Sequence, residues 1–369
     1  MKILNVISVF RPHGGTIAKL RTIVQHSRNE HQIYFYCYPH EYEEAKTLDG
    51  YYKEIGVQTY YGNVGRNFIK AVFEIKNIIK ENKIDIVHYY FNYENLTITL
   101  LKTLCPNVKY IRSFVGYIDI SPFRKQTLRL ALRRTENYVY ISNYIKEKYE
   151  ETHQLLKKKY STIIYNCPIY IDKGEIDVAA KDIILYVGAI NEHKNVPQLI
   201  ETMNIVVNEF KRDDIVLQIV GDGKDRKQVE ELIAKYNLQK NVILHGAVKG
   251  PIEYYRRCKI YLHAATNEGF GISVTEAMFM KCPCIVANTS GLKEVMSEEC
   301  GYILPYNDPK IWAEKLIYLN DNKEIREEFG ENAYIRAKEM FSREKFINAH
   351  DQMYEYIYKN GSLKEYNNQ

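Results

Sequence analysis

The sequence predicts an α/β protein built from two doubly wound domains in series. The chain has 369 residues, and at roughly 150 residues per domain this length indicates two domains. Short apolar runs alternate with amphipathic helical patterns, as is typical of βαβ units with parallel sheets. The alternation pauses once, at a polar stretch around residues 165–177, and then restarts, so each half is expected to form its own sheet.

The first half contains five apolar runs that we interpret as strands. They cover residues 2–10, 32–38, 85–90, 108–113 and 137–141. Helical patterns lie between them, at residues 16–27 and 66–82. In the second helix Phe68, Val72, Ile75 and Ile79 recur at the spacing of one helix face. We expect His88, at the end of a strand, to be a hydrogen-bonded core histidine.

The second half repeats the pattern and then becomes helical. Its expected strands cover residues 182–187, 216–220, 242–244, 260–263, 284–287 and 302–304. Residues 309–358 are helical in pattern, with Ser342 as a candidate N-cap for the last helix. We therefore place an N-terminal domain at residues 1–167, a C-terminal domain at 168–341 and a final helix at 342–369.

Charge is distributed unevenly between the halves. The net charge is +5, but residues 1–166 carry 25 Lys and Arg against 15 Asp and Glu, whereas residues 167–369 carry 26 against 31. A basic half indicates an anionic partner. No recognised nucleic-acid module is present and the basic residues lack interleaved aromatic side chains, which argues against nucleic acid.

One basic segment of the first half has two interpretations. Leu128, Ala131 and Leu132 fall on one side of an expected helix, among five cationic residues: Arg124, Lys125, Arg129, Arg133 and Arg134. The segment is either a core helix with a solvated basic face or an interfacial helix that docks on anionic lipid. An anionic membrane surface is therefore a candidate partner.

The cysteines and the apolar runs bear on the compartment. The seven cysteines have no framework spacing, which is typical of a reducing environment. No apolar run reaches the ~18 residues of a membrane span. We expect a cytoplasmic protein, with attachment to the inner face of the cytoplasmic membrane left open. Cys282-Pro-Cys284 is interpreted as a buried strand entry, so no metal site is expected.

The strongest chemical signal is the stretch Asn267-Glu-Gly-Phe-Gly-Ile-Ser-Val-Thr-Glu-Ala-Met278. Gly269 and Gly271 permit a tight turn and a close backbone approach. A helix that begins near Ile272 offers free N–H groups and a dipole that favour phosphate. Glu276 is placed to accept from two ribose hydroxyls, and Glu268 lies nearer the reacting centre. The alternative is an ordinary strand–turn–helix with solvated glutamates.

This stretch resembles the signature of family 4 glycosyltransferases (glycosyl transferases group 1), in which two glutamates are separated by seven residues. Residues 186–195, 219–223, 244–248 and 287–294 are similar to further motifs of that family, and residues 12–15, 85–88 and 140–142 match more loosely. The resemblance implies a GT-B fold: two Rossmann-like domains facing across a cleft, with the last helix crossing back to the first domain.

The resemblance also implies a function. It predicts transfer of a hexosyl unit, with retained anomeric configuration, from a UDP- or GDP-sugar to a surface-glycan or lipid-linked acceptor. Neither a metal nor another cofactor is required. The chain contains no Asp-x-Asp, which fits a metal-independent reaction.

Residue roles follow from the same resemblance. Glu268 and Lys194 are the implied catalytic residues: Glu268 contacts the transferred sugar, and Lys194 neutralises the diphosphate. The implied donor-binding residues are Gly14, Gly15, Lys194, Gly246, Ala247, Val248, Glu268, Gly269, Phe270, Gly271, Ile272, Ser273 and Glu276.

Two positions depart from the family pattern. Ala189 stands where the family has an Arg that shares the diphosphate with the Lys, and Val115 stands where it tends to have a His. His13 and Arg112 are the candidates to compensate, on the acceptor side. The departures leave open a non-catalytic scaffold in a glycan-assembly complex. A nicotinamide dehydrogenase is disfavoured because no Gly-x-Gly-x-x-Gly follows the first strand, and an epimerase would not usually carry the paired glutamates.

Overall fold

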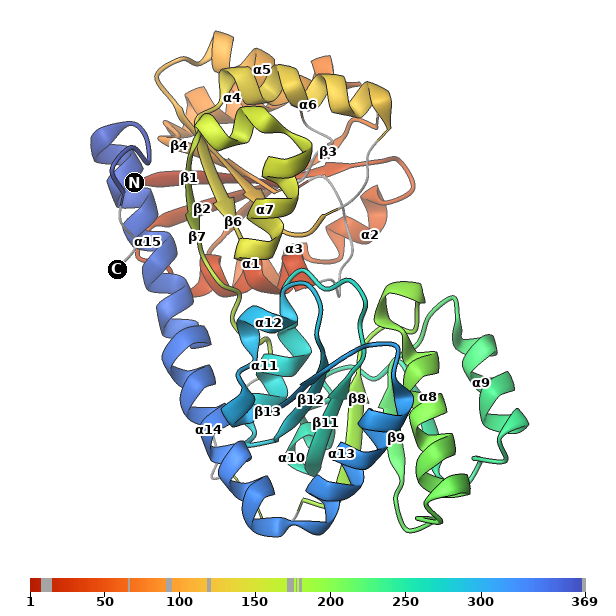
Figure 1. Ribbon diagram of the computed structural model, residues 1–369. Helices are drawn as coiled ribbons and strands as arrows, with labels where there is room; N and C mark the ends of the chain where they lie inside the picture. Colours follow the sequence, from red (N-terminus) through yellow and green to blue (C-terminus); the bar gives the residue numbers. More distant parts are fainter. Residues whose placement is uncertain are drawn as a thin grey trace. The chain divides into compact units, whose positions relative to one another are not determined.

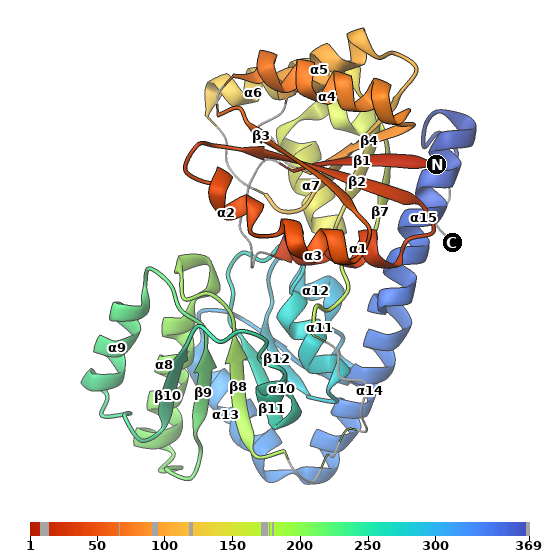
Figure 2. The same cartoon turned by 180° about the vertical axis from the view of Figure 1, so that it is seen from behind.

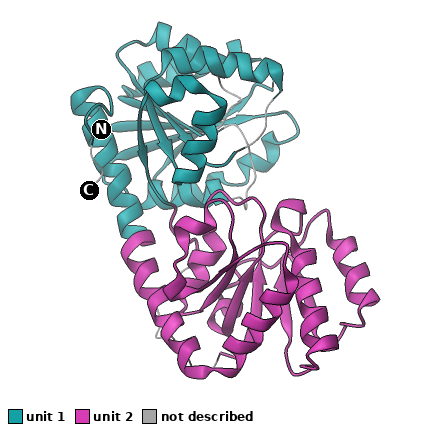
Figure 3. Cartoon of the chain, viewed as in Figure 1, with its two compact units in different colours: residues 1–165, 343–369 teal, residues 166–342 magenta. Residues whose placement is uncertain are grey.

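The computed structural model describes residues 1–7, 15–65, 67–90, 95–117, 121–170, 176, 178 and 181–366. The chain divides into two compact units (Figure 3). Unit 1 comprises residues 1–165 and 343–369, and unit 2 comprises residues 166–342. Among the described residues, no helix combines the length and the apolar character needed to cross a membrane.

Unit 1 contains a parallel sheet of seven strands in the order β3-β2-β1-β4-β5-β6-β7. The strands are β1 (Lys2–Ile7), β2 (Glu30–Cys37), β3 (Gln58–Asn63), β4 (Ile86–Tyr89), β5 (Lys109–Phe114), β6 (Asn137–Tyr140) and β7 (Tyr160–Ile163). The order reverses at β1, as in doubly wound sheets. The five strands predicted in this half are present, and β3 and β7 are additional edge strands.

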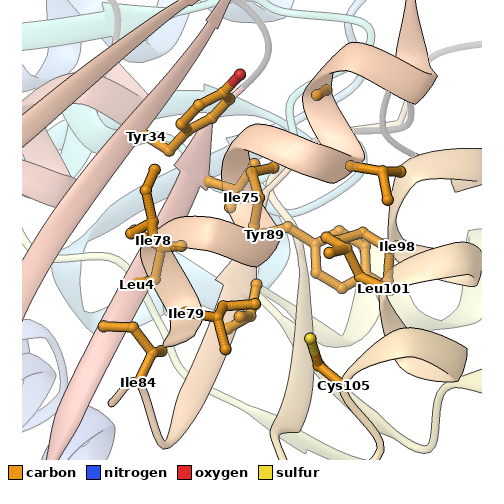
Figure 4. Packing of buried hydrophobic residues seen from close by; sticks show 14 of the residues in the cluster. Leu4, Tyr34, Ile75, Ile78, Ile79, Ile84, Tyr89, Ile98, Leu101 and Cys105 are labelled. Carbon is orange, nitrogen blue, oxygen red and sulfur yellow. The ribbon is translucent and has the colours of Figure 1, made fainter. Parts of the chain in front are cut away.

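Helices cover both faces of this sheet (Figures 1 and 2). Leu4 and Val6 of β1 pack on one face against α4 (Phe68–Asn82) and α5 (Asn95–Leu104), in the cluster drawn in Figure 4. Ile7 packs on the other face with α1 (Gly15–His26), α2 (Tyr42–Lys46) and α3 (Asp49–Glu54). Burial on both faces explains why the strands read as continuous apolar runs.

Three further helical segments complete unit 1: α6 (Pro122–Arg134), α7 (Asn143–Thr152) and the short η1 (Gln154–Lys158). The last helix, α15 (Arg343–Asn360), also belongs to this unit. Its Asp351 accepts hydrogen bonds from the Ser27 hydroxyl, from Arg28 N–H at 3.0 Å and from Asn29 Nδ2 at 2.8 Å. His88 is fully buried, 2.7 Å from both Ser113 Oγ and Tyr354 OH, as expected for a core histidine.

Unit 2 contains a parallel sheet of six strands in the order β10-β9-β8-β11-β12-β13. The strands are β8 (Ile183–Val187), β9 (Leu217–Val220), β10 (Val242–Gly246), β11 (Cys258–His263), β12 (Cys284–Ala287) and β13 (Gly301–Leu304). All six were predicted, and the order is that of a Rossmann domain. The prediction of two doubly wound α/β domains is confirmed.

The helical segments of unit 2 connect these strands. They are η2 (Glu192–Lys194), α8 (Val196–Asn204), η3 (Ile205–Glu209), α9 (Arg226–Lys235), α10 (Ile252–Arg256), α11 (Ile272–Phe279), α12 (Leu292–Val295), η4 (Glu298–Cys300), α13 (Pro309–Asp321) and α14 (Lys323–Phe341). Most of the predicted site residues lie in this unit, on loops that follow β8, β10 and β11.

Candidate active site

The candidate site lies at the carboxyl ends of β8 and β11 in unit 2. These strands are neighbours in the sheet, and the strand order reverses there, since β9 follows β8 on one side and β11 on the other. Ligands of open α/β sheets bind outside such a switch point. The loop after β8 carries Lys194, and the loop after β11 carries Glu268.

The β8 loop holds Lys194 through a short turn. Asn191 Oδ1 accepts a hydrogen bond from Lys194 N–H at 3.2 Å and so caps the 3-10 turn. Asn195 follows in the left-handed region, at φ 50°, and starts α8. The β11 loop is fastened to this turn by Thr266 N–H, which donates to His193 O at 2.9 Å. These backbone contacts bring Lys194 to Glu268.

Lys194, Glu268 and His263 form the centre of the site. Lys194 Nζ donates to Glu268 Oε2, and the same carboxylate oxygen lies 3.2 Å from His263 Nε2. The exposed fraction of the side chain is 23% for Lys194, 16% for Glu268 and 0% for His263. The two predicted catalytic residues are therefore in direct contact, although 74 positions separate them.

Electrostatics keep this carboxylate ionised. Burial by itself would raise the pKa of Glu268, but the charge of Lys194 and the hydrogen bond from His263 outweigh it and hold the pKa well below its usual range. Burial also lowers the pKa of His263, so the imidazole is neutral at neutral pH. Its Nε2 then carries the proton, because an ionised carboxylate only accepts hydrogen bonds.

His263 was not among the predicted site residues. It is the last residue of β11, and its ring stacks with Tyr186, at 5.8 Å between centroids, and with Tyr261, at 6.2 Å. Within the described part of the chain, its buried Nδ1 has no hydrogen-bond partner. The sequence signal was its place at a strand end, five residues before Glu268, but an apolar run that closes on His is equally typical of a core histidine.

The glycine-rich loop runs into the N-terminus of α11. Gly271 caps this helix with φ 105°, a conformation that favours glycine. Ile272 and Ser273 occupy the first turn, where backbone N–H groups have no helical acceptor and favour anions. Phe270 is buried and packs edge-to-face on Phe341 at 5.3 Å between centroids, so only its backbone is placed to meet a ligand.

The turn after β12 is hydrogen-bonded to the loop that carries Glu268. Thr289 Oγ1 donates to Ala265 O at 2.6 Å, and Gly291 N–H donates to Glu268 O at 2.9 Å. A Cβ atom on Gly291 would lie 2.5 Å from Gly269 O and 2.7 Å from Gly269 C. Both neighbours are backbone atoms, so a side chain at residue 291 cannot be accommodated unless the loop that carries Glu268 moves.

We therefore expect Gly291→Ala to lower activity at least tenfold and to destabilise the chain by about 1 to 3 kcal/mol, the range for overpacking a well-packed region. Turnover and chemical denaturation measure the two effects. Gly50→Ala is the matched control, because a Cβ at Gly50 meets nothing within 4 Å. Wild-type turnover in Gly291→Ala would show that the position of this loop is not critical.

Glu276 occupies a more enclosed environment than the sequence indicated. It is only 4% exposed, and its Oε1 accepts from Ile169 N–H and Tyr170 N–H, both at 3.1 Å. Its Oε2 accepts from Tyr255 OH at 2.8 Å. Burial raises the pKa of Glu276 to about 7, although these three hydrogen bonds act in the opposite direction. A ribose would have to share or displace them.

The remaining predicted donor-binding residues of unit 2, Gly246 to Val248, lie at the end of β10 and on the loop that follows it. Gly246 O accepts from Gly221 N–H at 2.8 Å, whereas Ala247 and Val248 are exposed. A Cβ on Gly221 would lie 1.8 Å from Gly188 O, so the 221–223 turn packs directly on the β8 loop. Ala189 is exposed on the β8 loop, and its O accepts from Tyr186 OH at 2.9 Å.

The structure describes two of the four predicted site residues of the first half. His13 and Gly14 lie outside the described residues, and Gly15 is the first residue of α1. Arg112 is completely buried, its Nη2 donates to Asn95 Oδ1 at 2.8 Å, and its guanidinium lies over the Tyr89 and Phe114 rings. Its proposed contact with an acceptor stays a prediction.

Comparisons with known proteins agree with this arrangement. The sequence model of the family described as Glycosyl transferases group 1 matches residues 172–336. An uncharacterised glycosyltransferase of Methanocaldococcus jannaschii is 26% identical, with 79% of this chain and 81% of the relative covered. A capsular polysaccharide biosynthesis glycosyltransferase of Staphylococcus aureus is 29% identical, but the match covers 49% of this chain and 48% of the relative.

A solved structure extends the likeness to the fold. The Anabaena protein HepE, crystallised in complex with UDP, has a TM-score of 0.78 and 14% identity, and 96% of this chain and 100% of that chain are covered. The predicted GT-B-type fold and the prediction of a glycosyltransferase are confirmed by these findings. The finer assignment to family 4 stays a prediction.

Proposed function

We propose that this chain transfers a hexosyl unit from a UDP- or GDP-sugar to a surface-glycan or lipid-linked acceptor, with retained anomeric configuration and without a metal ion. The observation that carries the proposal is the contact between Lys194 and Glu268 beside the N-terminus of α11. It combines one cation, one ionised carboxylate and a row of backbone donors at the switch point of a Rossmann sheet.

This combination suits departure of a nucleoside diphosphate. Negative charge grows on the phosphate oxygens as the sugar leaves, and a fixed ammonium and a helix N-terminus stabilise such charge. Lys194 has three N–H donors, so it can keep one on Glu268 while another meets phosphate. Glu268 stays ionised and accepts from sugar hydroxyls. It also favours the positive charge that develops on the sugar ring in an oxocarbenium-like transition state.

The proposed bond changes are balanced without an added cofactor. The bond from the anomeric carbon to the phosphate oxygen breaks, and its electron pair stays on the leaving diphosphate. The acceptor hydroxyl oxygen attacks the same face of the sugar and forms the new glycosidic bond. Its proton passes to the departing phosphate oxygen. Residues 246–248 are proposed to contact the base through main-chain groups, and Glu276 the ribose.

The relatives support the choice of substrates. The Anabaena structure contains UDP, which favours a uridine nucleotide, and the Staphylococcus aureus relative is named for capsular polysaccharide biosynthesis, which favours a surface glycan.

Among the described residues, no group of three His, Cys, Asp or Glu side chains could hold a metal ion. In the proposed site Lys194 supplies the positive charge beside the diphosphate.

Calorimetric titration with UDP and with GDP, in the presence of EDTA, tests the proposal. We expect micromolar binding of one nucleotide by the wild type and at least a tenfold loss of affinity in Lys194→Ala and in Glu276→Ala, since charged hydrogen bonds are removed. Lys227→Ala is the control, because that lysine is 88% exposed and pairs with Glu231 on the surface of α9.

The outcomes separate the candidate functions. Loss of binding in both variants but not in Lys227→Ala supports the site and justifies a screen of sugar donors. Binding of neither nucleotide by the wild type would argue against the proposed donor and favour the scaffold alternative. Binding that depends on added Mg²⁺ would contradict the metal-independent mechanism.

We further propose that unit 1 docks on an anionic membrane through the face formed by α4, α5 and α6. Helix α4 contacts α5, and α5 contacts α6 (Figures 1 and 2). Leu128, Ala131 and Leu132 of α6 are buried, but large apolar side chains are exposed on all three helices: Ile69, Phe73, Leu100, Leu104, Phe123 and Leu130. Exposed apolar residues beside five cations are typical of an interfacial surface.

Flotation with liposomes tests the membrane proposal. Wild-type protein is expected to float with vesicles that contain anionic lipid and to remain unbound with neutral vesicles. Phe123→Ser and Arg129→Glu should each weaken anionic-vesicle binding about fivefold or more. The first removes apolar area that would be buried in the interface, and the second removes a basic residue, which contributes about 1 kcal/mol near an anionic surface. Phe210→Ser, at an exposed aromatic of unit 2, is the control. Equal flotation of all variants would exclude this face.

A further inference from the structure

A cavity of about 370 Å³ lies in unit 2 at the edge of the sheet opposite the candidate active site. Its residues precede or begin β8, β11 and β12 or lie on the first turns of α14. In a parallel sheet the amino ends of the strands share one edge and the carboxyl ends share the other. Strands of five or six residues separate the two edges by about 15 to 20 Å.

The wall of this cavity is strongly basic. Five cationic side chains line it: Lys181, Lys259, Lys281, Lys323 and Arg326. Two carboxylates also line it, and each is already paired: Glu331 lies 2.6 Å from Lys281, and Glu327 lies 3.7 Å from Lys323. Among the described residues, the other three cations of the wall have no carboxylate partner of their own.

The three remaining cations donate to amide, carbonyl and thiol acceptors. Lys259 Nζ donates to Asn320 Oδ1 at 2.7 Å, and Arg326 Nη1 donates to Leu319 O at 2.8 Å and Asn320 O at 2.9 Å. Lys181 Nζ donates to Cys258 O at 3.0 Å, to Met280 O and to Cys282 Sγ at 3.3 Å, and the hydrogen bond from Cys258 and the charge of Lys181 lower the pKa of the Cys282 thiol. In the part of the chain that the structure describes, none of the three has a carboxylate within 4 Å.

Nearby acidic groups compensate this wall only in part: Glu327 and Asp321 act on Arg326. Asp214 and Asp321 are the carboxylates that act on Lys259 from farther away, but both are engaged by the guanidinium of Arg212 at 2.7 to 2.8 Å. Burial lowers the pKa of Lys259 and of Arg326, and the charge of Arg326 lowers the pKa of Lys259 further. A bound anion would relieve this concentration of positive charge.

We propose that this cavity binds a small soluble anion with two or more phosphoryl groups, at a site separate from the donor site. Three cations that have no carboxylate within 4 Å among the described residues match a diphosphate better than a single phosphate. Lys and Arg donors form strong charge-assisted hydrogen bonds with phosphoryl oxygens. The volume lies in the usual range of small-molecule sites. The side chain of Pro283 adds an apolar patch to the wall.

Calorimetry with inorganic pyrophosphate tests this proposal on the full-length chain. The Lys194→Ala background removes the cation that would hold a diphosphate in the active site. We expect this variant to bind one molecule of pyrophosphate per chain and to bind inorganic phosphate with at least tenfold lower affinity. Addition of Lys259→Gln is expected to weaken pyrophosphate at least tenfold, because glutamine can keep a hydrogen bond to Asn320 but has no charge. Lys227→Gln, in the same unit, is expected to change nothing.

A second variant guards against a folding artefact. Lys323 starts α14 and its side chain is 72% exposed, so Lys323→Gln should melt like the wild type and still weaken pyrophosphate about threefold or more. Equal affinity in the Lys194→Ala background with and without Lys259→Gln would overturn the proposal. So would binding to phosphatidic acid vesicles that Lys259→Gln abolishes and pyrophosphate fails to displace, since the ligand would then be a lipid headgroup.

Discussion

Replacement of Lys194 by alanine is expected to reduce kcat by about 100- to 1,000-fold, the usual effect of removing one preorganised donor from a developing anion. Lys194 is the cation that contacts Glu268, and the loop after β8 aims it at the carboxyl end of the sheet. Because charge on the leaving diphosphate grows only in the transition state, kcat should fall more than KM rises. Steady-state kinetics with the donor sugar measure both constants.

Two companion variants separate charge from hydrogen bonding. Lys194→Gln retains a donor to Glu268 without the charge and is expected to be nearly as slow as Lys194→Ala, whereas Lys194→Arg should keep part of the activity. Lys227→Ala, on the exposed surface of α9, is the control. If all three Lys194 variants kept wild-type kcat and only their stability changed, the contact with Glu268 would be structural.

Ala189 offers a gain-of-function test of the same mechanism. The resembled family has an Arg at this position, and here the alanine is exposed on the loop that carries Lys194. An arginine side chain therefore has room to extend without displacing a packed neighbour. Introduced into the Lys194→Ala variant, Ala189→Arg is expected to raise its activity at least tenfold. Absence of any rescue would indicate that the diphosphate does not approach residue 189.

The fold followed from apolar runs because parallel strands buried on both faces must be apolar throughout. Edge strands are less constrained, and β3 and β7 escaped prediction for that reason. Residues 58–63 mix polar and aromatic side chains, and β7 has only four residues, the first of them exposed. Local sequence contains too little signal for such segments, and pairing with β2 or β6 decides their conformation.

The site could be predicted in its residues but not in its contacts. Lys194 and Glu268 were identified from motifs, yet their ion pair depends on how two loops 74 positions apart are fastened. Arg112 shows how little local sequence reports about burial, because nothing in the run Ile111-Arg-Ser113 reveals that the guanidinium is buried against Tyr89 and Phe114. Burial is a property of the packed sheet, and a single charged residue in a strand does not report it.

Glu276 is expected to make the stability of the chain depend on pH in an unusual direction. Burial raises its folded-state pKa to about 7 from its ordinary value of 4.5, so between these two pH values the folded state holds a proton that the unfolded state has lost. The stabilisation is fully present below pH 4.5 and is lost as pH rises through 7. Relative to Glu276→Gln, the wild type should lose about 2 to 3 kcal/mol of unfolding free energy between pH 5 and 8.

Chemical denaturation of both proteins across this pH range measures the difference, in which the contributions of other titrating groups cancel. Tyr255→Phe is the matched variant: it removes one hydrogen bond to the carboxylate, so the folded-state pKa rises and the loss with pH becomes steeper. If Glu276 also binds ribose, Glu276→Gln should weaken UDP at least tenfold at pH 8. A pH-independent difference in stability would mean that the carboxylate is ionised in the fold, and that the hydrogen bonds from Ile169, Tyr170 and Tyr255 offset its burial.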